Sequence, residues 1–272
     1  MSSPIRRQGI MVRAFGIVVL LFLSTPMLVV AVAALDPGDF FTFPPHEISP
    51  HWFVQFITDP SWRSALFLTL TIGGLTALVS TIVGGCAGIA IARLAPRLRV
   101  FAYPLLIAPI TVPVIILAIS FYSLALRLHL VGHLATFVTA NALLSAPLVA
   151  LFVTGAALGV DHRLELASLS CGAGPLRTFF RVTVPLVAPV AAVGGVIAFL
   201  LVMDEVTMSI FLVTPGNVPL GVMMFVEVRS GTAPIVNAAA SLLIVATMVI
   251  VVSLTQLRNL LAARPDRQPL RR

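Results

Sequence analysis

The chain has 272 residues, of which 59% are hydrophobic and only 10% are charged. Soluble domains carry about a quarter charged residues, so this composition excludes an ordinary soluble protein and indicates an integral membrane protein. The formal net charge of +7 rests on arginine alone, because the chain has no lysine. These arginines lie at the ends of apolar segments and not on a soluble basic face, which argues against a nucleic-acid-binding protein.

Six apolar segments are long enough to cross a membrane, since a spanning helix needs about 20 residues. We expect them at residues 14–35, 63–92, 101–126, 134–160, 186–212 and 234–257. The first segment could instead be a secretory signal with Ala31-Val-Ala33 as its cleavage site, but it exceeds the roughly 7–15 residues of a signal core. The sequence therefore predicts an all-α membrane protein with six transmembrane helices.

The second apolar segment carries small residues at a spacing of four. Ser80, Gly84 and Gly88 would lie on one face of a helix. Such a stripe lets two helix backbones approach closely, so we interpret it as a helix-packing surface.

Three prolines lie inside the third apolar segment, at positions 104, 109 and 113. Proline removes a backbone donor and opens the helix, so these positions predict kinks. The carbonyl groups that the kinks free would need partners on neighbouring helices or in a cavity.

A polar loop at residues 161–185 follows the fourth apolar segment and differs in character from the chain around it. Large apolar residues recur in it at roughly helical spacing, beside three arginines: Leu166, Leu169, Leu176, Phe179 and Phe180. Gly172-Ala-Gly174-Pro175 interrupts the run, which predicts two short helices joined at a bend. An apolar ridge of this kind is typical of a helix on a membrane surface or of one that enters a groove on a partner.

The arginines are distributed unevenly between the loops. The N-terminal tail, residues 93–99, residues 161–181 and the C-terminal tail together hold 14 of the 17 arginines. Loops rich in arginine stay in the cytoplasm, so both termini and the 161–185 loop are predicted to be cytoplasmic.

The 161–185 loop resembles the EAA loop of ABC-importer permeases. In that family a Glu-Ala-Ala triplet is followed after three residues by glycine and, after nine more, by Ile-x-Leu-Pro. Gly172 takes the glycine position here, and Val182-Thr-Val184-Pro185 takes the ending with the same count between them. The triplet position holds Leu166-Ala167-Ser168, so Glu165 lies one residue earlier than the family glutamate.

This resemblance implies a type I ABC importer permease fold, multi-pass in a bacterial inner membrane. Residues 1–62 would form the tail, first transmembrane helix and external loop, 63–257 the core permease domain, and 258–272 a basic cytoplasmic tail. The implied partners are a second, different permease subunit, two ATPase subunits that bind the ATP, and an extracytoplasmic solute-binding protein, with lipid around the helices. The residues expected to couple to the ATPase are Glu165, Leu166, Ala167, Leu169, Gly172, Ala173, Phe179, Phe180 and Pro185.

Asp204-Glu205 is an acidic pair inside the fifth apolar segment. An acid in the middle of a membrane costs about 2.5–3.5 kcal/mol, so the pair is not expected to face lipid. One interpretation is a buried pair satisfied by an arginine or a helix end; the other, which we favour, is the negative lining of a route for cations, with Thr207, Met208 and Ser209 near the same wall. Residues 199–211 are also similar to permeases of the spermidine/putrescine branch, which implies a polyamine substrate.

The sequence shows no catalytic constellation. It has no Gly-x-x-x-x-Gly-Lys-Ser/Thr phosphate loop, so it is not expected to bind ATP or to act as an enzyme. His129 and His133 lack a third ligand, and we expect no metal site and no cofactor. Alternatives are a permease for ferric iron, thiosulfate or phosphonate, a secondary transporter in which Asp204 and Glu205 relay protons, and a receptor-like scaffold without transport.

Overall fold

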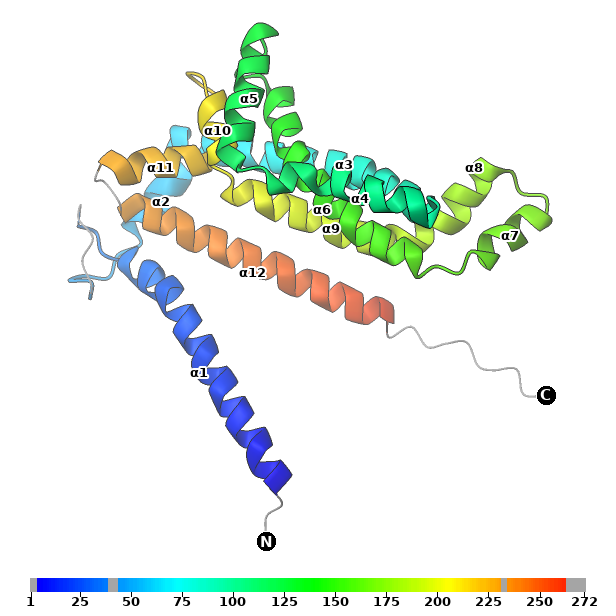
Figure 1. Ribbon diagram of the computed structural model, residues 1–272. Coiled ribbons are helices and arrows are strands. Elements are labelled where there is room, and N and C mark those ends of the chain that lie inside the picture. The colour runs from blue at the N-terminus through cyan, green and yellow to red at the C-terminus, as the bar shows by residue number, and fades with distance from the viewer. Residues whose placement is uncertain (1–3, 39–43, 231–233, 263–272) are drawn as a thin grey trace. The chain divides into compact units, whose positions relative to one another are not determined.

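The computed structural model describes residues 4–38, 44–230 and 234–262, with the backbone alone given at 4–12, 14, 254 and 257–262. Its described residues form thirteen helical elements (Figure 1). In chain order they are α1 (Pro4–Ala33), α2 (His51–Thr58), α3 (Pro60–Arg93), α4 (Pro96–Thr111), α5 (Val114–Arg127), α6 (Leu134–Leu158), α7 (Arg163–Ser170), α8 (Pro175–Thr178), the π-helix η1 (Phe179–Thr183), α9 (Val184–Asp204), α10 (Thr207–Leu212), α11 (Leu220–Ser230) and α12 (Pro234–Ala262). Most of the predicted C-terminal basic tail lies outside the described residues.

The prediction of an all-α membrane protein is confirmed. Five helical segments in the described chain are long and apolar enough to cross a membrane, and α4 with α5 forms a sixth, bent candidate. These two helices meet at 88° across Val112 and Pro113. Val112 is extended, at φ −80° and ψ 134°, which is the conformation that a following proline favours. The third span is therefore broken, where the sequence analysis expected one kinked helix.

The fifth predicted span also differs from the structure. The helix that we expected to run to about residue 212 ends at Asp204, because Glu205 is extended at φ −82° and ψ 104°. A separate short helix, α10, then begins at Thr207. The apolar composition on both sides of the acidic pair hid this break.

Two compact units are present, and each is described by itself. The first comprises Met1–Arg63 with Val226–Arg272, and in it α12 contacts α1 and α2. The second comprises Ser64–Phe225 and contains the helices around α6 and α9. The functional division at residues 62/63 and 257/258 stays a prediction.

The small-residue stripe of α3 packs against α6, as predicted. A Cβ atom on Gly88 would lie 2.7 Å from the carbonyl oxygen of Ala150, so only glycine permits this approach. The hydroxyl oxygens of Ser80 and Ser145 are 2.7 Å apart across the same interface, and the Thr154 hydroxyl donates to the Gly88 carbonyl over 3.2 Å. The two helices therefore form a close-packed pair held by short polar contacts.

We predict that Gly84→Ala destabilises the protein by about 1–3 kcal/mol, because overpacking forces backbone shifts. A methyl group at this position would press on the Ala146 carbonyl oxygen and would lie 2.9 Å from the Val149 Cβ atom. The matched control is Gly85→Ala, whose added Cβ meets nothing within 4 Å and which gains up to about 1 kcal/mol of helix propensity. Thermal unfolding in detergent compares the two; equal melting temperatures would refute the close packing.

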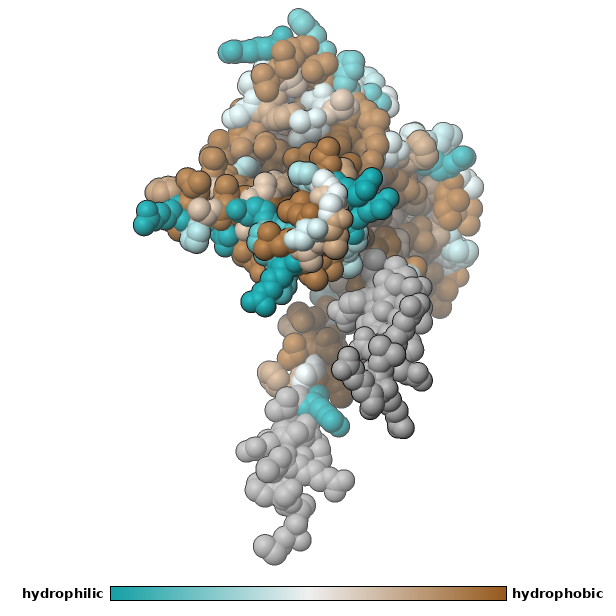
Figure 2. Space-filling view, turned by 90° about the vertical axis from the view of Figure 1, so that its right-hand side faces the viewer, coloured by the Kyte–Doolittle hydropathy of each residue, from teal (hydrophilic) through white to brown (hydrophobic). Residues whose placement is uncertain are grey.

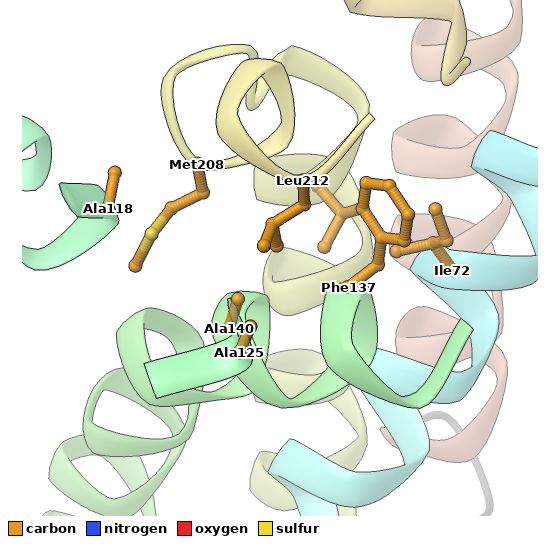
Figure 3. Packing of buried hydrophobic residues seen from close by; sticks show 8 residues of the cluster. Ile72, Ala118, Ala125, Phe137, Ala140, Met208 and Leu212 are labelled. Atoms are coloured by element: carbon orange, nitrogen blue, oxygen red, sulfur yellow. The ribbon is translucent and has the colours of Figure 1, made fainter. Parts of the chain in front are cut away.

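A hydrophobic cluster lies where α3, α5, α6, α9 and α10 meet (Figure 3). Its buried members are Ile72, Ala118, Ala125, Phe137, Ala140, Val202, Met208 and Leu212. Because α10 contributes two of these side chains, the short helix after the acidic pair is fixed by packing and not by its own length.

Candidate functional site

The 161–185 loop folds into two short helical pieces and a π-helical turn that leads into α9, at one end of the Ser64–Phe225 unit (Figure 1). The predicted bend is present between α7 and α8. In η1 the Val184 N–H donates to the Phe179 carbonyl, the i to i+5 bond that defines a π-helix. Such turns are rare and are frequent at functional sites.

Gly172 ends α7 with a left-handed residue, at φ +81°. The N–H of Ala173 donates to the Ser168 carbonyl over 3.2 Å, and the N–H of Gly172 donates to the Leu169 carbonyl over 3.0 Å. This pair of bonds is the Schellman motif, which commonly uses glycine because a Cβ atom is unfavourable there. The glycine that identified the loop in the sequence therefore has a backbone role.

We predict that Gly172→Ala destabilises the end of α7 by about 1–2 kcal/mol, the cost of a left-handed conformation for a residue with a Cβ atom. The space around Gly172 is open, so a packing clash contributes nothing, and Gly172→Asn should cost less. Gly174→Ala is the control, since Gly174 is extended at φ −69° and also has open space. Hydrogen exchange of the α7 amides measures the effect; similar exchange in Gly172→Ala and Gly174→Ala would contradict the assignment.

Glu165 is the one buried residue of α7, at 9% exposed. Its Oε1 atom accepts from the Arg93 guanidinium and from the Thr183 hydroxyl, the latter over 2.6 Å. Its Oε2 atom lies 3.1 Å from Nδ1 of His162. Arg93 ends α3 and Thr183 ends η1, so one carboxylate links α7 both to a membrane helix outside the loop and to the last turn of the loop.

Arg93, His162 and Thr183 were not predicted as site residues. Arg93 is 72 positions from Glu165 in the chain, and in the sequence it stands out only as one of the positive charges that set the orientation. An acid on the inward-facing side of a short amphipathic helix is the sequence feature that could have indicated this pair. Such a buried carboxylate requires a cation and hydrogen-bond donors.

The apolar ridge of the loop is mostly exposed. Phe180 is 64% exposed, and Leu166, Leu169 and Ala167 are also exposed. Ala173 and Phe179 are half-buried, and Phe179 packs against the cluster that contains Val153 and Val187. Viewed from the end of the Ser64–Phe225 unit that carries α7 and α8, the surface shows hydrophilic and hydrophobic residues side by side (Figure 2). Of the nine predicted coupling residues, only Glu165 is buried; Gly172 and Pro185 are exposed.

The acidic pair lies at the opposite end of α9 from the loop. The 21 residues of α9 separate the two sites by roughly 30 Å, at 1.5 Å per residue. Asp204 is exposed, whereas Glu205 is half-buried and its Oε1 atom accepts from the Met208 N–H over 2.7 Å. Glu205 therefore accepts from one of the free N–H groups in the first turn of α10, and the structure gives Asp204 no such bond among the contacts it describes.

The other three predicted pathway residues lie deeper. Thr207 is half-buried, and Ser209 is buried. Met208 is 1% exposed and packs in the cluster beside Leu212 and Ala118 (Figure 3). The role of these residues in a pathway stays a prediction, and the neighbours of Met208 in the cluster are apolar.

A cavity of about 390 Å³ lies between α3, α4, α5 and α6. Its lining is apolar except for Thr139, and it includes Val83, Leu106, Phe121 and Pro147. An apolar lining provides no charge that could orient a cation. Within the described residues no group of three metal-ligating side chains is present either.

Comparison with known proteins relates this chain to a family of transport proteins. Residues 84–267 match the family model of the binding-protein-dependent transport system inner membrane component. The chain is 29% identical over 232 residues to the putrescine transport system permease protein PotI of Escherichia coli (strain K12), with 82% of each chain covered. It is 27% identical over 202 residues to the spermidine/putrescine transport system permease protein PotC of the same organism, with 74% of this chain and 76% of the relative covered.

A solved structure has the same fold. A chain of a bacterial ABC transporter involved in the import of the acidic polysaccharide alginate matches with a TM-score of 0.72 at 17% identity, covering 93% of this chain and 96% of that chain. The prediction of an ABC importer permease fold is thereby confirmed. The chain belongs to the family of binding-protein-dependent transport system inner membrane components, and it is a multi-pass permease subunit of an ABC importer that works with a solute-binding protein and has no ATPase activity of its own.

Proposed function

We propose that this permease carries polyamines, such as putrescine or spermidine, across the inner membrane. The observation that supports this substrate class most strongly is the similarity to PotI and PotC over most of the chain. The acidic pair Asp204-Glu205 adds a physical reason, because carboxylates beside the pathway would favour an organic cation over an anion. Asp204 has the exposed side chain that this role requires.

The driving force would come from separate ATPase subunits that grip the 161–185 loop. The exposed ridge of Leu166, Leu169 and Phe180 has the spacing of a helix that lays its apolar face in a groove. Leu176, at 76% exposed, extends the same ridge. Ala167, Gly172, Ala173, Phe179 and Pro185 would complete the docking set, and Glu165 would belong to the coupling machinery.

The complex would contain a second, different permease subunit and two ATPase subunits beside the solute-binding protein. One permease with six candidate spans offers half of a channel wall. ATP-driven closure of the two motors would move both loops together, and α9 would carry the movement across the membrane to the acidic pair at its far end.

Reconstitution in proteoliposomes tests the proposal. The permease, expressed with the permease, ATPase and binding protein encoded beside it, is assayed for ATP-dependent uptake of radiolabelled putrescine and spermidine. Ferric iron, thiosulfate and phosphonate serve as competing solutes. Uptake of one of these instead would overturn the polyamine assignment. Uptake that needs a proton gradient and no ATPase would overturn the coupling mechanism as well.

A further inference from the structure

We propose that Glu165 is a positioning residue that fastens the coupling loop to the rest of the permease from inside. Its contacts with Arg93 and Thr183 would make α3, α7 and the start of α9 move as one body. This inference rests on the proposed coupling function of the loop. It assigns Glu165 a partner within its own chain, whereas the resemblance grouped it with residues that meet the ATPase.

Burial separates Glu165 from the ridge residues. Its side chain is 11% exposed, while Leu166, the next residue, is 50% exposed. A partner that docks on the ridge would therefore cover Leu166 without reaching the carboxylate. Contact between Glu165 and an ATPase would require the loop to detach from α3 first.

Both carboxylate oxygens are already engaged. Oε1 accepts from Arg93 and from Thr183, and Oε2 faces His162. A carboxylate that is itself 11% exposed and accepts from a guanidinium and a hydroxyl is strongly oriented, because charge-assisted bonds are the stronger class of hydrogen bond. The contacts fix α7 to the end of α3 through Arg93 and to η1, which leads directly into α9, through Thr183.

The position of the contacts suits the transfer of force. Thr183 is the last residue of η1 and directly precedes α9, and Arg93 ends the helix that packs closely on α6. A push on the ridge would then reach α9 through Thr183 and the α3–α6 pair through Arg93. Without these contacts α7 would be held to the membrane helices only indirectly, through the backbone and the packing of Phe179, and a push could tilt α7 while the membrane helices stay in place.

The first test neutralises the charges of Glu165 and Arg93 one at a time and then exchanges them. We expect Glu165→Gln and Arg93→Gln each to lower substrate uptake per ATP hydrolysed by about tenfold, the change that a loss of about 1.4 kcal/mol in coupling produces. ATPase subunits should still co-purify with these variants. The double variant Arg93→Glu/Glu165→Arg should recover part of the coupling, as expected for residues that act as a pair. Arg97→Gln, at an exposed arginine nearby, is the control.

The second test changes no charge, so it remains usable if the charge variants of the first test fail to fold. Thr183→Val removes the hydroxyl at nearly constant volume, and Thr183→Ser retains it; we expect only the valine variant to lower the uptake-to-hydrolysis ratio. Thr76→Val is the matched control, because the buried Thr76 hydroxyl has no hydrogen-bond partner among the described residues.

Two outcomes would overturn the inference. If Glu165→Gln releases the ATPase while Arg93→Gln and Thr183→Val do not change coupling, Glu165 is a direct docking residue. If all variants keep the wild-type ratio, the contacts have no role in coupling. Failure of the proposed function is distinguishable, since the unchanged permease would then neither bind an ATPase nor show ATP-dependent uptake.

Discussion

The substitutions Leu166→Glu and Phe180→Glu are each expected to release the ATPase from the permease without unfolding the permease. Both side chains are exposed in the structure, so the folded permease tolerates a charge there. In a docked complex each would lose the roughly 1.5–3 kcal/mol of a buried apolar side chain and would place a charge in an apolar groove. We expect ATPase retention to fall at least about tenfold for each variant, as measured by co-purification from detergent extracts, with ATP-driven uptake lost in parallel.

The matched control for these variants is Ile48→Glu. Ile48 is also an exposed apolar residue, at 81%, but it lies in the loop between α1 and α3, which is predicted to face the outside. Ile48→Glu should leave ATPase retention unchanged. Normal retention and uptake in Leu166→Glu and Phe180→Glu would show that the motor grips another part of the chain and would remove the physical basis of the docking proposal.

Asp204→Asn is expected to lower polyamine uptake by about tenfold or more. A charge-assisted hydrogen bond contributes roughly 1.5–3 kcal/mol, and the substitution removes the charge while it keeps the shape of the side chain. Initial rates of putrescine uptake in proteoliposomes measure the loss, with ATPase stimulation as a check on assembly. Normal uptake in a correctly folded Asp204→Asn variant would contradict a role for this carboxylate in the cation route.

Glu205 allows a sharper comparison because the structure gives it a second task. Glu205→Gln keeps an oxygen that can accept from the Met208 N–H, so its effect should report the charge alone. Glu205→Ala should in addition destabilise α10 by about 1 kcal/mol, the typical net contribution of one hydrogen bond. Glu47→Gln, at an exposed acid of the external loop, is the control for general effects of negative charge on uptake.

The number and kind of membrane helices followed from composition, because a hydrocarbon layer requires about 20 apolar residues and internal hydrogen bonds. Pro113 predicted a kink but not the size of the bend, and the acidic pair Asp204-Glu205 did not reveal the end of α9 because the residues on both sides of it are apolar. An 88° bend depends on which side chains the two halves pack against. Helices α5 and α10 pack against each other and against α6, through Met208 and Leu212.

The candidate site was predictable in its exposed part. The spacing of Leu166, Leu169 and Phe180 shows a ridge because helical periodicity is local. The link between Glu165 and Arg93 is a tertiary contact, and no rule of local spacing predicts it. The same holds for Thr183, whose side chain reaches Glu165 through the wide turn of η1.

The π-helix at Phe179–Thr183 also bears on how related permeases can diverge. A π turn contains about one residue more than an α turn and is accommodated as an insertion in a continuous helix. Loss of a single residue there would allow an ordinary α-helix to form, but it would rotate α7 and α8 by roughly 100° about the α9 axis, the angle per residue of an α-helix. Insertions and deletions at this point, more than any substitution on the ridge, would therefore determine the direction in which the ridge faces. They would thereby determine which ATPase subunits can bind it.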